Sequence, residues 1–125
     1  MTNYPVGDFL IQIKNQALAK GASVTVRKTK MIVEIAKALK TIGILREITE
    51  NQKEITVMLS FRKKEPVLME LKLISKPGLR VYMNVDEIAK RKGPKTYLIS
   101  TPKGIKSSKE AIKERTAGEV LAEIM

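Results

Sequence analysis

The chain has 125 residues and carries 24 Lys and Arg against 13 Asp and Glu, a formal net charge of +11, with neither cysteine nor histidine. The missing cysteine excludes disulfides and thiolate metal sites and suits a reducing compartment, and the missing histidine removes the commonest general base and metal ligand. No apolar run is long enough for a transmembrane helix, and residues 1–10 lack the charged start and apolar core of a signal peptide.

The first elements in chain order are a helix and a short strand. Pro5 suits a first helical turn, and apolar residues then recur at helical spacing as far as Ala17. Gly21 is predicted to close this helix, and residues 23–26 form the strand candidate.

A second helix and two strands complete the first half. Thr29 is a good N-cap for the helix and Gly43 a good stop. Strands are predicted at 44–49 and, from strict alternation, at 55–61, with the polar sequence "ENQK" as their turn.

The second half is predicted to consist mainly of strands. Residues 67–73 alternate, "SKPG" at 75–78 is a turn signal, and residues 79–83 alternate again, with Leu79 and Val81 facing the core. Asp86 is predicted to cap one helical turn.

The last elements are a strand, a capped helix and a final strand. The strand is predicted at 96–100. Ser107 and Glu110 spell a capping box, which predicts a helix from Ser108 to about Arg115, followed by a strand at 120–124.

Together these elements predict an α+β fold of two small domains. The polar sequence "RKKEP" marks the boundary, which gives an N-terminal α-β-α-β-β domain at 1–64 and a mostly β C-terminal domain with a short capped helix at 65–125. Both halves are basic: residues 1–65 hold 12 basic and 6 acidic side chains, and residues 66–125 hold 12 and 7. Such a field attracts nucleic acids, anionic membranes or acidic proteins.

Two basic segments are candidate anion sites. Arg27, Lys28 and Lys30 surround the start of the second helix, where cations oppose the helix dipole unless a phosphate binds. The basic loop "AKRKGPK" at 89–95 is suited to gripping a phosphate backbone. For both segments, an ordinary solvated surface is an equally good interpretation.

Two further segments carry polar side chains beside turns. In "SKPGLRVY", Arg80 and Tyr82 share one strand face, where a guanidinium and a phenol can stack on a base or reach a 2′-hydroxyl. "STPKGIKSS" lacks the glycine spacing of a phosphate-binding P-loop. Its hydroxyls and Lys103 are consistent with either a plain turn or an RNA-contact loop. On chemistry alone, the turn is slightly favoured.

Four stretches resemble the small-subunit ribosomal protein family numbered eight. "YPVGDFLIQIKNQ" is similar to its opening D-P-I-A-D-M-L-T-R-I-R-N-A, and "ISKPGLRVY" matches its I-S-K-P-G-L-R-V-Y. "ISTPKGIKSSKEA" resembles its I-S-T-S-x-G-[VI]-x-T-D-K-E-A, and "AGEVLAEI" its G-G-E-[VI]-L-x-x-[VI]. The order and spacing of the four also agree, from residue 4 to residue 124.

The resemblance implies a non-enzymatic, cytoplasmic constituent of the small ribosomal subunit, with no cofactor, metal, small-molecule substrate or membrane partner. Family members bind a helix in the central domain of small-subunit rRNA, support early assembly and meet neighbouring ribosomal proteins. Some bacterial members also repress their own operon by binding its mRNA.

By position, the resemblance assigns RNA contacts to both halves. The chief loop is Ser100, Thr101, Lys103 and Gly104, with Ser107 opening the helix after it. The residues that accompany this loop are Tyr82, Glu119, Lys30, Thr29, Lys92 and Lys95.

The chain departs from the family at Pro102, where the pattern has serine. Proline has neither a hydroxyl nor an N–H, so one hydrogen bond is lost or moves to Ser100 or Thr101. RNA contacts are therefore expected to shift toward lysines such as Lys92 and Lys95.

Two other function classes remain as alternatives. A general basic module would bind any duplex or anionic vesicle without preference for a bulged RNA. A phosphate-handling enzyme would use Lys103 with Glu110 or Glu119, but neither a histidine nor a glycine-rich cradle supports it.

Overall fold

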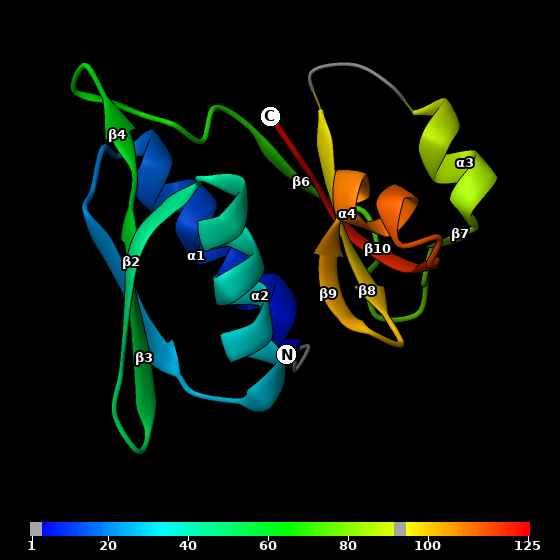
Figure 1. Cartoon of the computed structure of the whole chain (residues 1–125). Helices are drawn as coiled ribbons and strands as arrows, with labels where there is room; N and C mark the ends of the chain where they lie inside the picture. The colour runs from blue at the N-terminus through cyan, green and yellow to red at the C-terminus, as the bar shows by residue number, and fades with distance from the viewer. Residues whose placement is uncertain (1–3, 92–94) are drawn as a thin grey trace. The chain divides into compact units, whose positions relative to one another are not determined.

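The computed structural model describes residues 4–91 and 95–125 (Figure 1). The chain divides into two compact units, the first ending at Met69 and the second beginning at Glu70. Both units combine helices with an antiparallel sheet, so the predicted α+β class is confirmed. The segment "RKKEP", where the sequence placed the domain boundary, belongs to a small hairpin of β4 (Phe61–Arg62) and β5 (Glu65–Pro66) within the first unit.

The first unit has the predicted order α-β-α-β-β. Two helices cover one face of a three-stranded antiparallel sheet whose order is β1-β3-β2 (Figure 1). The elements are α1 (Pro5–Leu18), β1 (Ser23–Arg27), α2 (Lys30–Ile42), β2 (Leu45–Glu50) and β3 (Glu54–Leu59). Alternation along β3 buries Ile55, Val57 and Leu59 against the helices, while the intervening residues stay partly or fully exposed.

The ends of these helices follow from particular residues. Thr29 caps α2 by accepting a hydrogen bond from the Ile32 amide at 3.2 Å, and Gly43 ends it in the left-handed region at φ 105°. The turn after α1 places the left-handed conformation on Lys20 (φ 56°) rather than on Gly21. The Gly21 amide then donates to the Gln16 carbonyl, which closes the helix one residue earlier than the sequence suggests.

The second unit is built around its last strand. β10 (Gly118–Ile124) pairs with three other strands, and β9 is added outside β8. These strands are β6 (Leu71–Leu73), β7 (Tyr82–Met83), β8 (Thr96–Thr101) and β9 (Gly104–Ser107). Two short helices, α3 (Val85–Lys90) and α4 (Ser108–Lys113), complete the unit.

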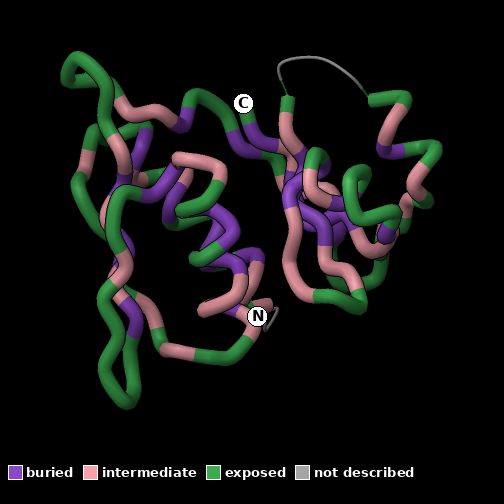
Figure 2. Tube along the Cα trace, viewed as in Figure 1, coloured by how far each residue is buried: buried purple, intermediate pink, exposed green. Residues whose placement is uncertain are grey.

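One face of this sheet forms a core with the helices. Ile99 of β8 and Val120 of β10 are fully buried against Ala111 of α4 and Ile88 of α3. Burial is continuous in the middle of both strands, at residues 97–99 of β8 and 120–122 of β10, and both strands become half-buried at Ser100 and Glu119 (Figure 2). Because successive side chains in a strand point to opposite faces, Ser100 and Glu119 lie on the face away from α4.

Three details of residues 65–125 differ from the sequence prediction. The strand predicted at 67–73 is reduced to Leu71–Leu73, and Met69 is 75% exposed. Leu79 does not face the core but is 66% exposed, because its backbone closes the turn with Lys76. The strand predicted at 79–83 is reduced to Tyr82–Met83; just before it, the buried Ser75 hydroxyl bonds both the amide and the carbonyl of Val81, and the same carbonyl also accepts from the Val120 amide of β10.

The cap of α3 also differs. Asn84, and not Asp86, begins the helix: its side chain accepts from the Glu87 amide at 2.8 Å, and the Glu87 carboxylate accepts from the Asn84 amide at 3.2 Å. Sequence inspection missed this reciprocal capping box because asparagine and aspartate lie two residues apart and both are good N-caps.

Candidate nucleic-acid interface

Three predicted site residues form a row across the second sheet. Glu119 of β10 is directly opposite Ser100 of β8 on one side and Tyr82 of β7 on the other. Residues paired in this way share one face of a sheet, so the three side chains are neighbours. We call Tyr82, Glu119 and Ser100 the recognition row.

The recognition row presents different chemistry at each position. Tyr82 is 67% exposed, which leaves its ring available to a partner. In the part of the chain that the structure describes, the half-buried Ser100 hydroxyl makes no hydrogen bond. Glu119 is largely covered and forms an ion pair with Arg80 at 3.2 Å, so its carboxylate holds that guanidinium beside the row.

The loop after Ser100 is a tight hairpin. Thr101 pairs with Gly104, which leaves Pro102 and Lys103 as the two-residue connection between β8 and β9. The Thr101 hydroxyl donates to the Gly104 carbonyl at 2.7 Å and accepts from the Lys103 amide at 3.1 Å. Gly104 has φ 113°, a conformation that a residue with Cβ rarely adopts. Both Pro102 and Lys103 are exposed.

The loop is therefore both a turn and a presented surface. The sequence predicted neither β9 nor the internal role of Thr101. The short run "GIKS" has no clear alternation, and a threonine hydroxyl can serve the backbone or a ligand equally well.

Gly118 fixes how closely β10 approaches this hairpin. A Cβ atom at residue 118 would lie 1.9 Å from the Ser100 carbonyl oxygen, so only glycine allows the strands to approach here. Gly118 therefore supports the recognition row by its lack of a side chain.

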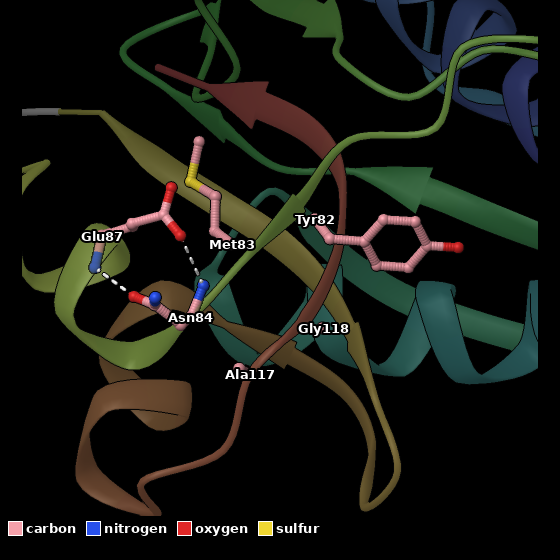
Figure 3. Close-up of a pocket in the computed structure, with 6 residues that line it drawn as sticks. All are labelled: Tyr82, Met83, Asn84, Glu87, Ala117 and Gly118. Atoms are coloured by element: carbon pink, nitrogen blue, oxygen red, sulfur yellow. Dashed lines mark hydrogen bonds between the residues drawn. The ribbon is translucent and has the colours of Figure 1, made fainter.

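A shallow pocket lies at the opposite end of β7 from Arg80 (Figure 3). It has a volume of about 400 Å³ and is lined by Tyr82, Met83, Asn84, Glu87, Ala117 and Gly118. The capping hydrogen bonds between Asn84 and Glu87 hold one wall, while Tyr82 points away from Met83. The row and this pocket thus share Tyr82.

Ser107 has a structural role. It is buried at the N-cap of α4, where its hydroxyl accepts from the Glu110 amide at 3.3 Å and lies 3.4 Å from the Glu110 carboxylate. The predicted N-cap is confirmed, but the Glu110 carboxylate accepts from the Ser107 hydroxyl rather than from the Ser107 amide, as a capping box would require. The helix ends at Lys113, two residues before the predicted Arg115.

Lys95 is paired with an acid of its own sheet. Its ammonium lies 2.6 Å from the Glu123 carboxylate. This hydrogen bond and the attraction between the charges raise the pKa of Lys95, and the bond to Lys95 lowers the pKa of Glu123. Lys92, the other lysine assigned to this loop, lies outside the described residues.

The remaining two candidates belong to the first unit. The Thr29 hydroxyl caps α2, and Lys30 is the first residue of that helix, with its side chain exposed. Lys28 nearby lies 3.6 Å from Glu50. The first turn of α2 contains no acidic residue, so the local field there stays positive.

The described residues offer neither a metal site nor a membrane-spanning helix. Residues 4–91 and 95–125 contain no group of His, Cys, Asp and Glu arranged to hold a metal ion. No helix in these same ranges has the length and apolarity needed to cross a membrane.

Comparison with known proteins identifies the family. The model of the family described as "Ribosomal protein S8" matches residues 4–125. The chain belongs to the ribosomal protein S8 family. This is a family of ribosomal structural proteins and not of enzymes.

Three members of the S8 family illustrate the similarity. The small ribosomal subunit protein uS8 of Thermosynechococcus vestitus is 38% identical over 126 residues, covering 95% of each chain. The uS8 protein of Roseiflexus castenholzii is 35% identical over 125 residues with the same coverage. The uS8 protein of Nitratidesulfovibrio vulgaris is 34% identical over 125 residues, covering 99% of each.

Proposed function

We propose that this chain is a structural constituent of the small ribosomal subunit that binds a helix in the central domain of small-subunit rRNA. The observation that carries the proposal is the recognition row beside a cationic hairpin, in a member of the S8 family. The relatives are named as small ribosomal subunit proteins, which supports the same assignment.

The row supplies the specific part of the binding. The Ser100 hydroxyl can donate to and accept from a 2′-hydroxyl or a base edge in the wide RNA minor groove. The exposed Tyr82 ring offers a stacking surface, and Arg80, oriented by Glu119, is held beside it. An irregular helix exposes such base edges better than a regular duplex does.

The cations supply the general part. Lys103 at the hairpin tip neutralises a phosphate, and Lys30 with Thr29 adds a backbone contact from the first unit. Lys92 and Lys95 contribute charge in the preceding loop. Lys95 can bind a phosphate in one of two ways: its ammonium leaves Glu123, or it divides its three N–H donors between the Glu123 carboxylate and the phosphate.

Assembly follows from the same binding. A chain that recognises one rRNA helix orders it for neighbouring ribosomal proteins. An mRNA segment that copies the helix would compete for the row, which is how the protein would repress its own operon.

The test is a gel shift with the central-domain rRNA helix against a regular duplex of equal length. We expect tighter binding to the rRNA helix at moderate salt. Equal affinity for both RNAs would favour a general basic module instead, and binding of the operon mRNA segment in competition with the rRNA helix would support repression.

A further inference from the structure

The outer surface of α4 carries a second set of cations. Lys109 and Lys113 are exposed and lie one helical turn apart, and Arg115 follows just after the helix. In the ranges 4–91 and 95–125 none of the three forms an ion pair with an acidic group. We call Lys109, Lys113 and Arg115 the basic α4 face.

The acidic residues of the same segment are directed elsewhere. Glu110 turns to the Ser107 hydroxyl at 3.4 Å, and Glu114 pairs with Lys106 at 3.3 Å. The alternating sequence "KEAIKER" therefore does not give a neutral surface. Its carboxylates are engaged by the protein, whereas its cations remain available.

Arg115 extends the basic α4 face beyond the end of the helix. It occupies the left-handed position after α4, at φ 51°, and the amides of Arg115 and Thr116 donate to the carbonyls of Ile112 and Ala111. Glycine is the usual residue in this type of helix end. Lys20 adopts the same conformation after α1, so this conformation is not specific to Arg115, and what Arg115 adds to the basic α4 face is its exposed charge.

The sheet separates this surface from the recognition row. Ala111 of α4 packs on Ile99 and Val120, and the next residues along these strands, Ser100 and Glu119, belong to the opposite face. An RNA helix docked on the row therefore lies across the sheet from Lys109 and Lys113.

We propose that the basic α4 face is a second RNA-binding surface, which takes the phosphate backbone of an RNA segment other than the one on the recognition row. Unit two then joins two RNA segments across its sheet. Three cations spaced along one short element suit successive phosphates of a strand, and Ile112 between them, 38% exposed, can contact sugar carbons. The binding would depend on charge and not on sequence.

The test is a capture assay with the full chain. The rRNA helix is immobilised, the chain is bound to it, and a labelled regular RNA duplex is added. We expect the wild type to capture the duplex, with Lys109→Glu/Lys113→Glu still binding the helix but capturing at least about tenfold less. The control Lys37→Glu/Lys53→Glu changes the charge equally at exposed lysines of the first unit and should capture normally.

A second arm does not depend on the recognition row. Regular duplex is titrated directly into Lys103→Ala and into Lys103→Ala/Lys109→Glu/Lys113→Glu, and the salt dependence of binding is measured. We expect the log–log slope to fall by about two between these proteins. This arm remains informative if the rRNA helix itself is not recognised.

Three outcomes would overturn the inference. One is equal duplex capture by the wild type and by Lys109→Glu/Lys113→Glu. Another is an unchanged salt slope in the second arm. The third is capture of polyglutamate in preference to RNA, which would assign the basic α4 face to an acidic protein.

Discussion

The start of α2 and the β8–β9 hairpin use the same residue types for different purposes. Each combines a threonine with a nearby lysine, and each threonine hydroxyl bonds the backbone of its own segment. Only the hairpin adds a second hydroxyl, that of Ser100, beside a strand row that carries Tyr82 and Glu119. A side-chain hydroxyl is therefore a candidate ligand only where the hydrogen bonds of the neighbouring backbone are already satisfied without it.

The largest expected effect comes from the glycine behind the hairpin. Gly118→Ala places a methyl group against the Ser100 carbonyl, so β8 and β10 must separate, at a cost of about 3 kcal/mol in the free energy of unfolding. Urea denaturation measures this. The start of α2, at residues 27–31, contains no glycine on which a strand contact of this kind depends.

Gly43→Ala is the matched control at the end of α2. A Cβ there meets nothing within 4 Å, so only the left-handed backbone is penalised, by about 1 kcal/mol. Equal losses in the two variants would mean that strand contact at Gly118 is not what requires glycine.

Removing one hydroxyl from each region separates a structural role at the start of α2 from a binding role in the β8–β9 hairpin. Thr29→Ala should lower the free energy of unfolding by about 1 kcal/mol through the lost cap, and should weaken binding to the rRNA helix and to a regular duplex alike, without changing the discrimination between them. Ser100→Ala should leave stability unchanged and reduce discrimination between the rRNA helix and a regular duplex by about 1–3 kcal/mol. Calorimetry measures the change in stability, and gel shifts measure the change in discrimination. A loss of discrimination in Thr29→Ala, together with a loss of stability alone in Ser100→Ala, would contradict the roles given to the two regions.

A smaller effect is expected at the hairpin tip. Lys103→Ala removes one exposed cation while the turn is kept by Thr101 and Gly104. RNA binding should weaken for all sequences, and its salt slope should fall by about one. Lys37→Ala serves as the control, because it removes an exposed lysine from α2 without touching either region. An equal loss of RNA affinity and of salt slope in both variants would mean that Lys103 acts only through the net charge of the chain.

The smallest effect is a pH dependence at the far end of the same sheet. The hydrogen bond from Lys95 lowers the pKa of Glu123, so the folded chain holds this proton less tightly than the unfolded chain. The resulting stability is present above the unfolded pKa, roughly 4.3, and is lost as the pH falls through the lower folded pKa. Glu123→Gln should flatten the acid limb of the stability profile.

Glu47→Gln is the matched control for this profile, since Glu47 is exposed and forms no ion pair within the described ranges. An acid limb that is as steep in Glu123→Gln as in the wild type would show that the pair with Lys95 contributes nothing. On the alkaline side, the raised pKa of Lys95 predicts stability that is lost only as the pH rises through that value.

Local signals in the sequence predicted most of the first unit. The N-cap at Thr29, the stop at Gly43 and the alternation in β3 are each confirmed, because they depend on neighbours within a few residues. The same holds for the cap at Ser107. Such rules act through a single helical turn or strand.

The second unit was harder to predict because its strands are defined by distant partners. Leu79 alternates correctly for a core strand, yet its backbone pairs with Lys76 in a turn, and residues 79–83 join β10 only from Val81 onward. The strand β9 and the close approach at Gly118 also depend on residues far along the chain. For the candidate site, the chemistry of the side chains indicated which types of residue could bind RNA. The resemblance to the family indicated at which positions of the chain they lie.

The central place of β10 has a consequence for synthesis of the chain. β6, β7 and β8 all pair with residues 118–124, so none of these pairings exists until that segment has emerged from the exit tunnel. The first unit, in contrast, holds all its strand partners by residue 66. Vectorial folding therefore forms the two units at different times, and the recognition row exists only after the last strand has closed the sheet.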